Sequence, residues 1–130
     1  MSSTDPSPAG ELPLPAPDLK TDTVVVGEAV VCVLAGDLHQ GTGPIGARAL
    51  AEALHRRPAL LAVDLNAIEL FSADGLNALL TVREAARDQG VPLVVLSPSR
   101  AVRRVLEVAG ADGLFTVYGT VQEALAQHER

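Results

Sequence analysis

The stretch Leu60-Leu-Ala-Val-Asp-Leu-Asn-Ala-Ile-Glu-Leu-Phe-Ser-Ala-Asp-Gly-Leu-Asn-Ala-Leu-Leu80 carries the change from a buried strand to an amphipathic helix. Its first part, Leu60 to Leu65, is almost entirely apolar, as expected of a strand covered on both faces. After a short loop, the spacing predicts a helix over residues Asp74 to Gln89. We expect one apolar face on this helix, formed by Leu76, Leu79, Leu80 and Ala86.

The start of the predicted helix is polar. Ser72 is a natural N-cap, because its hydroxyl can accept from backbone N–H groups that have no partner inside the helix. Asp74 in the first turn is favourably placed against the positive end of the helix dipole. From chemistry alone, Ser72 to Gly75 is an ordinary helix cap, at a position in the sheet where a function can reside.

Length and composition indicate one domain with an aliphatic core. The chain has 130 residues, of which 48% are apolar. Its aromatic residues are few: Phe71, Phe115 and Tyr118. The scarcity of aromatic rings argues against a base-stacking platform, and the net charge of −6 argues against nucleic acid and anionic membranes as partners.

The single cysteine and the absence of targeting signals in the sequence suggest a cytoplasmic protein. Cys32 lies in an apolar run, so we expect a small buried hydrophobe that forms no internal disulfide. We see no basic-plus-apolar leader and no long apolar run. The three histidines have no metal-ligand spacing, and neither a metal nor another cofactor is expected.

The first residues differ in composition from the rest. Residues 1–21 hold five of the nine prolines, and we expect a disordered Pro-rich tail because so little apolar surface cannot offset the ordering entropy. The folded domain is expected over residues 22–128.

The pattern of the remaining chain predicts an α/β fold. We expect a mixed β-sheet of about five strands with about four helices and right-handed crossovers. Besides the elements above, these are a hairpin of Thr23–Val26 and Val30–Leu34, a loop over Gly36–Gly41, a helix that begins at Thr42 or Gly43 and stops before Pro58, a strand over Val91–Leu96, a helix from Ser97-Pro98 to Gly110, a strand over Leu114–Val117 and a helix over Thr120–Gln127.

The residues themselves reveal no catalytic group. Asp37 and His39 form at best a weak acid/base pair, and solvated loop residues are the simpler interpretation. Asp64 is expected at the carboxyl end of a strand, where ligand sites in α/β sheets gather, but it has no neighbouring base or metal ligand. A basic cluster is interpreted as the exposed face of an amphipathic helix, with an acidic partner surface as the alternative: Arg100, Arg103 and Arg104.

Three segments together resemble the STAS domain of anti-anti-sigma factors. They are "VVCVLAGDLHQGTG" from Val30, "LAVDLNAIELFSADGLNALL" from Leu61 and "VPLVVLSPSRAVRRVLEVAGADGLFTVYGTVQEAL" from Val91. The likeness spans about residues 22 to 127. It implies a regulator that binds an anti-sigma factor, itself a GHKL-type serine kinase, and so frees a sigma factor. Phosphorylation of a serine at the helix start switches that binding off in the family.

The chain departs from the family at the phosphorylation site. The family pattern is D-S-x-G; aligned on Gly75, Ser72 stands at the aspartate position and Ala73 at the acceptor. Three outcomes follow, of which we favour the first: binding without phosphorylation control, a switch moved to Ser72, or a standing negative charge from Asp74 that weakens kinase binding. In the loop, the family's G-E-L-D is replaced by a sequence ending in His39.

The resemblance also implies a partner-binding surface. It would comprise the loop after the second strand and the helix start, with these residues: Asp37, His39, Thr42, Ser72, Ala73, Asp74, Gly75, Leu76 and Asn77. We expect a monomer or a weak homodimer that is not an enzyme. One alternative is a sensory or scaffold STAS module that binds another protein, or a small ligand near Asp64 and Leu96. An enzyme of flavodoxin-like or phosphotransfer type is the other.

Overall fold

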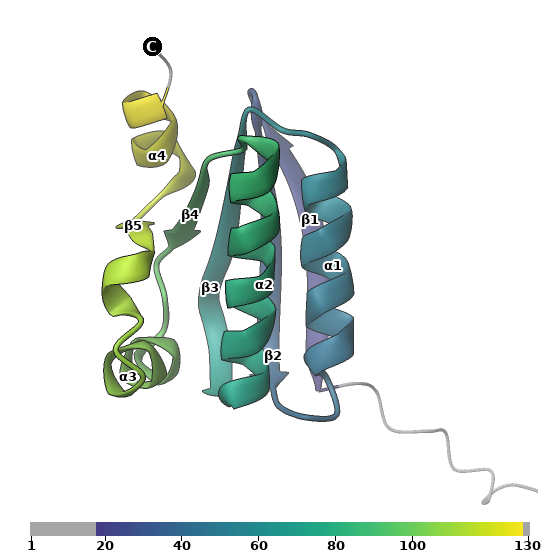
Figure 1. Cartoon of the computed structure of the whole chain (residues 1–130), viewed down its shortest axis with the longest axis vertical. Helices are drawn as coiled ribbons and strands as arrows, with labels where there is room; N and C mark the ends of the chain where they lie inside the picture. Colours follow the sequence, from purple (N-terminus) through teal and green to yellow (C-terminus); the bar gives the residue numbers. More distant parts are fainter. Residues whose placement is uncertain (1–17, 129–130) are drawn as a thin grey trace, which may run out of the picture.

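A computed structural model describes residues 18–128 and shows a five-stranded sheet with four α-helices and one 3-10 helix in that range (Figure 1). The elements in chain order are β1 Leu19–Val26, β2 Ala29–Leu38, α1 Gly43–His55, β3 Leu60–Phe71, α2 Ala73–Gln89, β4 Leu93–Leu96, α3 Arg100–Val108, η1 Asp112–Leu114, β5 Thr116–Tyr118 and α4 Val121–His128.

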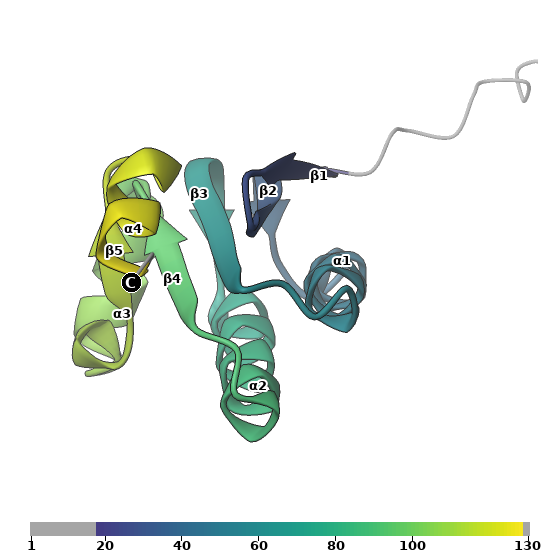
Figure 2. The same cartoon turned by 90° about the horizontal axis from the view of Figure 1, so that it is seen from above.

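The strands follow one another across the sheet in the order β1-β2-β3-β4-β5. β1 pairs antiparallel with β2, and the other neighbours are parallel. Helices α1, α2 and α3 cover one face and α4 packs on the other (Figure 2). The predicted α/β fold with a mixed sheet is therefore confirmed. No helix within residues 18–128 has both the length and the apolar character needed to cross a bilayer.

β3 is twice as long as predicted. The prediction of a loop after Leu65 is wrong, because the strand continues to Phe71 and stays paired with β2 as far as Leu38. The sequence does not indicate the extension, because the residues buried there do not alternate as in a regular strand. Every third residue is buried, namely Leu65, Ile68 and Phe71, next to two shifts of register in β2. Asp64 consequently lies in the middle of its strand rather than at the carboxyl end.

The first strand also begins earlier than predicted. β1 starts at Leu19, which is buried, so residues 19–21 of the expected tail belong to the sheet. The backbone N–H of Asp37 donates to the carbonyl of Asp18 at 2.8 Å. Gly36 has a φ of +115°, and a Cβ there would clash with the Asp18 carbonyl. Residues 1–17 of the expected tail lie outside the described residues.

Other helix and strand boundaries differ from the predicted ones by a few residues. β2 extends to Leu38, into the segment predicted as a loop, and β4 begins at Leu93 instead of Val91. β5 and α4 each start slightly later than expected, at Thr116 and Val121. The short helix η1 takes the place of the first residue assigned to the last strand.

Helix α2 buries a face slightly rotated from the predicted one. Leu79 and Ala86 are buried as expected, whereas Leu76 and Leu80 are only half-buried. Val82, which the prediction omitted, completes the buried stripe with Gly75 and Ala78. The stripe has the i, i+3, i+4, i+7 and i+11 spacing of a helix face that packs against a sheet.

Leu79→Ala is expected to lower the free energy of unfolding by about 2 to 5 kcal/mol, because Leu79 is 2% exposed and its removal leaves a cavity. Leu70→Ala, at a position that is 48% exposed, should cost less than about 1 kcal/mol and serves as the control. Urea titrations followed by circular dichroism measure both. A loss below about 1 kcal/mol for Leu79→Ala would show that the assigned helix face is wrong.

The buried thiol of Cys32 should make stability fall at alkaline pH. Burial raises the pKa of this thiol from 9.0 to about 11. The thiol is thus harder to ionise in the folded state. The contribution of the thiol to the free energy of unfolding is complete below pH 9. As the pH rises from 9 towards 11, that free energy falls by about 3 kcal/mol at most. In urea titrations between pH 8 and pH 11, wild-type stability should approach that of Cys32→Ala; a constant difference would contradict this.

Candidate functional site

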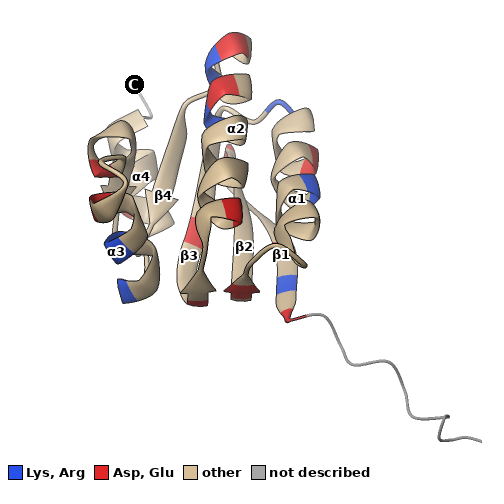
Figure 3. Cartoon of the chain, turned by 60° about the horizontal axis from the view of Figure 1, so that its bottom comes forward, with Lys and Arg blue, Asp and Glu red and all other residues tan. Residues whose placement is uncertain are grey.

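The loop from β2 to α1 and the turn from β3 to α2 meet at one end of the sheet, at the bottom of Figure 1 and turned forward in Figure 3. They meet because parallel neighbouring strands end at the same edge. The backbone N–H of Ser72 donates to the carbonyl of Leu38 at 2.9 Å, which joins the two segments directly. A Cβ on Gly43 would lie 3.4 Å from the Cβ of Asp74, so the starts of α1 and α2 are in van der Waals range.

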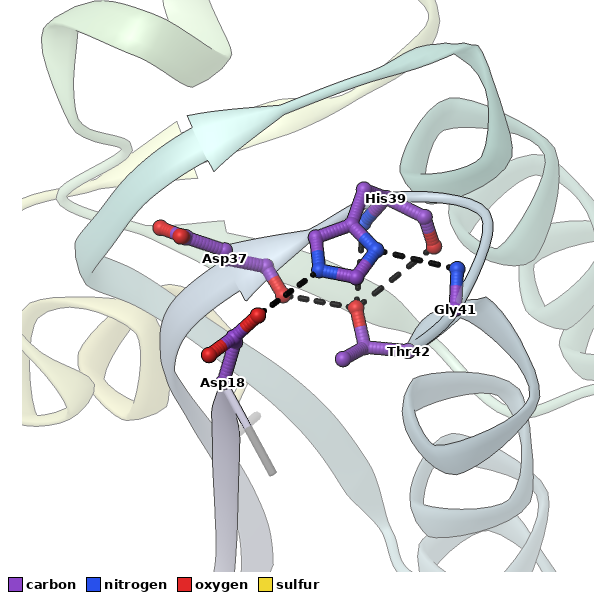
Figure 4. A network of polar contacts seen from close by, with 5 residues as sticks. All are labelled: Asp18, Asp37, His39, Gly41 and Thr42. Carbon is purple, nitrogen blue, oxygen red and sulfur yellow. Dashed lines mark hydrogen bonds and ion pairs between the residues drawn. The ribbon is translucent and has the colours of Figure 1, made fainter. Parts of the chain in front are cut away.

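Thr42 holds the loop from beneath (Figure 4). Its hydroxyl donates to the carbonyl of Asp37 at 2.7 Å and accepts from the backbone N–H of His39 at 3.0 Å. The carbonyl of His39 in turn accepts from the N–H groups of Thr42 and Gly43. Thr42 occupies the N-cap position of α1, as predicted, but its side chain makes no capping bond to that helix. At 4% exposure it shapes the loop without reaching its surface.

His39 ties the loop to the beginning of β1. Its Nδ1 accepts from the backbone N–H of Gly41 at 2.9 Å, and its Nε2 lies 3.1 Å from Oδ2 of Asp18. Because Nδ1 accepts, the proton of the neutral ring belongs on Nε2, which then donates to Asp18. The weak Asp37–His39 pair considered from the sequence does not form, since the Asp37 carboxylate points away from the imidazole in Figure 4.

The start of α2 is capped as the sequence predicts. Ser72 has an extended backbone, and its Oγ accepts from the N–H of Asp74 at 3.2 Å. Gly75 lies directly on the strand ends: a Cβ there would come within 2.8 Å of the Phe71 ring and 3.0 Å of the Cβ of Leu38. The first turn of α2 can therefore approach the sheet this closely only with glycine at position 75.

The structure brings all nine predicted surface residues to this end of the sheet, but their exposure differs. Asp37, His39, Ser72 and Leu76 are half-buried, and Thr42 and Gly75 are buried. The exposed residues are Ala73, Asp74 and Asn77. The outer surface is thus centred on the first two turns of α2, with the loop beside it.

The surface has an acidic and a basic side. Acidic residues lie at the ends of β2 and β3 and at the start of α2, while α3 carries the basic residues (Figure 3). Residues 18–128 hold no group of three or more His, Cys, Asp or Glu side chains that could bind a metal ion. A surface of small side chains and separated charges suits the docking of another protein better than the catalysis of a reaction.

Two features of this surface escaped the sequence analysis. Asp18 lies within the predicted tail, so its contact with His39 has no signal in the sequence, and the approach of α3 to the helix start at Ala73 depends on tertiary packing. The two residues of the alternative ligand site, Asp64 and Leu96, are register partners across β3 and β4, with Leu96 buried. The Asp64 carboxylate accepts from the N–H of Asn66 at 3.0 Å.

Comparisons with known proteins agree on one family. The STAS domain family model matches residues 20–124. The anti-sigma-F factor antagonist RsfB of Mycobacterium tuberculosis is 30% identical over 111 residues, which are 85% of this chain and 90% of that protein. The crystal structure of an anti-sigma factor antagonist from Mycobacterium paratuberculosis is 26% identical, with a TM-score of 0.78, over 90% of this chain and 100% of the other.

A more distant solved structure shares the fold. It is an anti-sigma-factor antagonist (STAS) domain protein from Planctomyces limnophilus, which is 18% identical with a TM-score of 0.69 and covers 85% of this chain and 98% of its own. At that identity the likeness concerns the fold alone.

Thr42→Val is expected to lower the free energy of unfolding by about 1 to 3 kcal/mol, because the carbonyl of Asp37 and the N–H of His39 lose a buried partner. Thr116→Val, in the exposed edge strand β5, is the matched control and should be nearly neutral. Urea titrations measure both, and amide NMR shifts in residues 37–43 should move only in the first. Equal stability of the two variants would contradict the assigned role of Thr42.

Proposed function

The chain belongs to the STAS domain family and to the anti-sigma factor antagonists within it, and from this premise we propose that it binds an anti-sigma kinase in the cytoplasm and thereby frees a sigma factor. The docking surface is formed by Asp37, His39, Ser72, Ala73, Asp74, Leu76 and Asn77 over the supporting residues Thr42 and Gly75. The protein acts as a regulator through binding and not as an enzyme.

The observation that carries the proposal is the position of Ala73. It is the first residue of α2 and it is exposed. The alignment of the family's D-S-x-G pattern on Gly75 assigns it to the position of the phosphorylated serine. A methyl group keeps the unmodified shape of the surface and offers no hydroxyl to a kinase. Docking therefore proceeds without the usual phosphorylation switch.

Ser72 is a poor substitute for the missing acceptor. Its Oγ is engaged as the helix cap, and the side chain is half-buried. One residue along a helix also turns a side chain by about 100°. A kinase that recognises the family position would meet the methyl group of Ala73 instead.

Asp74 provides the remaining alternative, a permanent negative charge beside the docking surface. Its carboxylate is exposed at the N-terminus of α2, where the helix dipole partly offsets the charge. A phosphoserine carries nearly two charges, so a single offset carboxylate is a much weaker obstacle to an acidic partner surface.

Ala73→Glu should reduce binding to an anti-sigma kinase at least about tenfold, because it places bulk and charge at the centre of the surface. Ala126→Glu, on the exposed side of α4 behind the sheet, is the matched control and should bind as the wild type does. Titration calorimetry against a panel of anti-sigma kinases, beginning with the anti-sigma-F factor of M. tuberculosis, measures the affinity. Circular dichroism melts establish that both variants fold.

The same samples, incubated with ATP and weighed by intact mass spectrometry, separate the alternatives. Binding by the wild-type chain with no added phosphate supports the unswitched antagonist. Phosphate on Ser72 with loss of binding would show that the switch has moved by one residue. Unchanged affinity of Ala73→Glu would show that the proposed surface is wrong, and absence of wild-type binding would reject the proposed function.

A further inference from the structure

A groove runs between the start of α2 and helix α3. We call it the α2–α3 groove, and it is lined by Ala73, Leu76, Arg104, Val105, Val108 and Ala109. The lining is aliphatic apart from Arg104. Val108 is 84% exposed, more than any other large hydrophobic residue within residues 18–128. Val108 is contiguous with the other aliphatic residues of the groove, and an exposed apolar patch of this kind is typical of a binding surface.

The groove is continuous with the proposed docking surface. Ala73 and Leu76 belong to both, since they lie on the first turn of α2. A partner that covers Ala73 therefore meets α3 immediately beside it.

Free positive charge borders the groove. Arg104 and Arg100 also line the adjoining hollow at the end of β3, and neither forms an ion pair with any residue of the described chain. Glu69 lines that hollow too, without pairing with either. Arg103 differs, because its Nε donates to the carbonyl of Pro98 at 3.2 Å. In a chain of net charge −6, two unpaired arginines next to an apolar groove favour an acidic ligand.

The spacing along α3 defines the ligand further. Arg100, Arg104 and Val108 are four residues apart, so they form one stripe with about 6 Å between successive members. A ligand that matches this stripe offers two carboxylates and one aliphatic side chain at the same intervals. One face of an amphipathic helix has this arrangement, and a groove between two helices accepts such a ridge.

We propose that the α2–α3 groove binds an acidic amphipathic helix of the anti-sigma partner, an inference that rests on the proposed function. The aliphatic side chain of that helix packs between Leu76, Val105 and Val108. Its carboxylates pair with Arg104 and Arg100. The basic cluster on α3 is then part of the docking surface and not merely the solvated face of a helix.

Other occupants fit less well. A second copy that docked α3 against α3 about a two-fold axis would bring arginines together. A nucleic acid backbone presents a continuous run of phosphates, whereas this face of the described chain offers only two unpaired arginines beside an apolar groove.

The test compares full-length variants in their binding to the anti-sigma-F factor of M. tuberculosis, by titration calorimetry at low and high ionic strength. Arg104→Glu and Val108→Asp should each weaken binding about tenfold or more, because each places a negative charge where the acidic helix docks. Both residues are exposed, so their replacement leaves the core intact. Arg104→Lys should weaken it less and retain the salt dependence. The matched control is Arg56→Glu, the same charge change at the exposed opposite end of the sheet, where α1 ends.

The outcomes separate this inference from the function on which it rests. Loss of binding in Ala73→Glu, with wild-type affinity in Arg104→Glu and Val108→Asp, would overturn the inference and leave the proposed function standing. Equal losses in Arg104→Glu and Arg56→Glu would indicate a general charge effect and also overturn it. A wild-type dimer in sedimentation analysis that Val108→Asp abolishes would assign the groove to a second copy. Absence of wild-type binding to every anti-sigma kinase of the panel would reject both proposals.

Discussion

The parallel pairing of β2 and β3 beyond the end of β4 is the constraint on which the site depends. β4 ends opposite Asp64, while β2 and β3 continue together to Leu38 and Phe71. This two-strand extension carries the loop and the helix start to the same place, where the N–H of Ser72 meets the carbonyl of Leu38. Without the extension, the two halves of the proposed docking surface would be separate loops with no common support.

Two glycines make the close packing at this end possible. Gly36 lets the chain before β1 pass directly beside β2, and Gly75 lets the first turn of α2 lie on the ring of Phe71. Thr42 then fixes the loop with partly buried hydrogen bonds, and His39 adds exposed ones to Asp18 and Gly41. The surface is therefore preorganised, and a partner that binds it needs to order few backbone groups.

The sequence predicts those parts of the structure that local pattern determines. The strand from Leu60, the Ser72 cap and the burial of Leu79 follow from hydrophobic period and cap chemistry. The end of β3 does not, since beyond Leu65 the register shifts of β2 break the alternation that identifies a strand. The contact of His39 with Asp18 joins residues 21 positions apart, and no local sequence pattern predicts it. The stripe on α3 is visible in the sequence, but its position beside Ala73 depends on how the helices pack.

The missing phosphorylation site and the free arginines are connected through the groove. Ala73 and Arg104 line it together, so a phosphoserine at position 73 would lie within reach of that guanidinium and would form a strong charge-assisted pair with it. Such a pair would remove from α3 the charge that we assign to the partner's carboxylate. A serine at this position would thus block docking in two ways, by repelling an acidic partner and by occupying its arginine. In the proposed complex, alanine at position 73 removes both effects and leaves Arg104 to the partner's carboxylate.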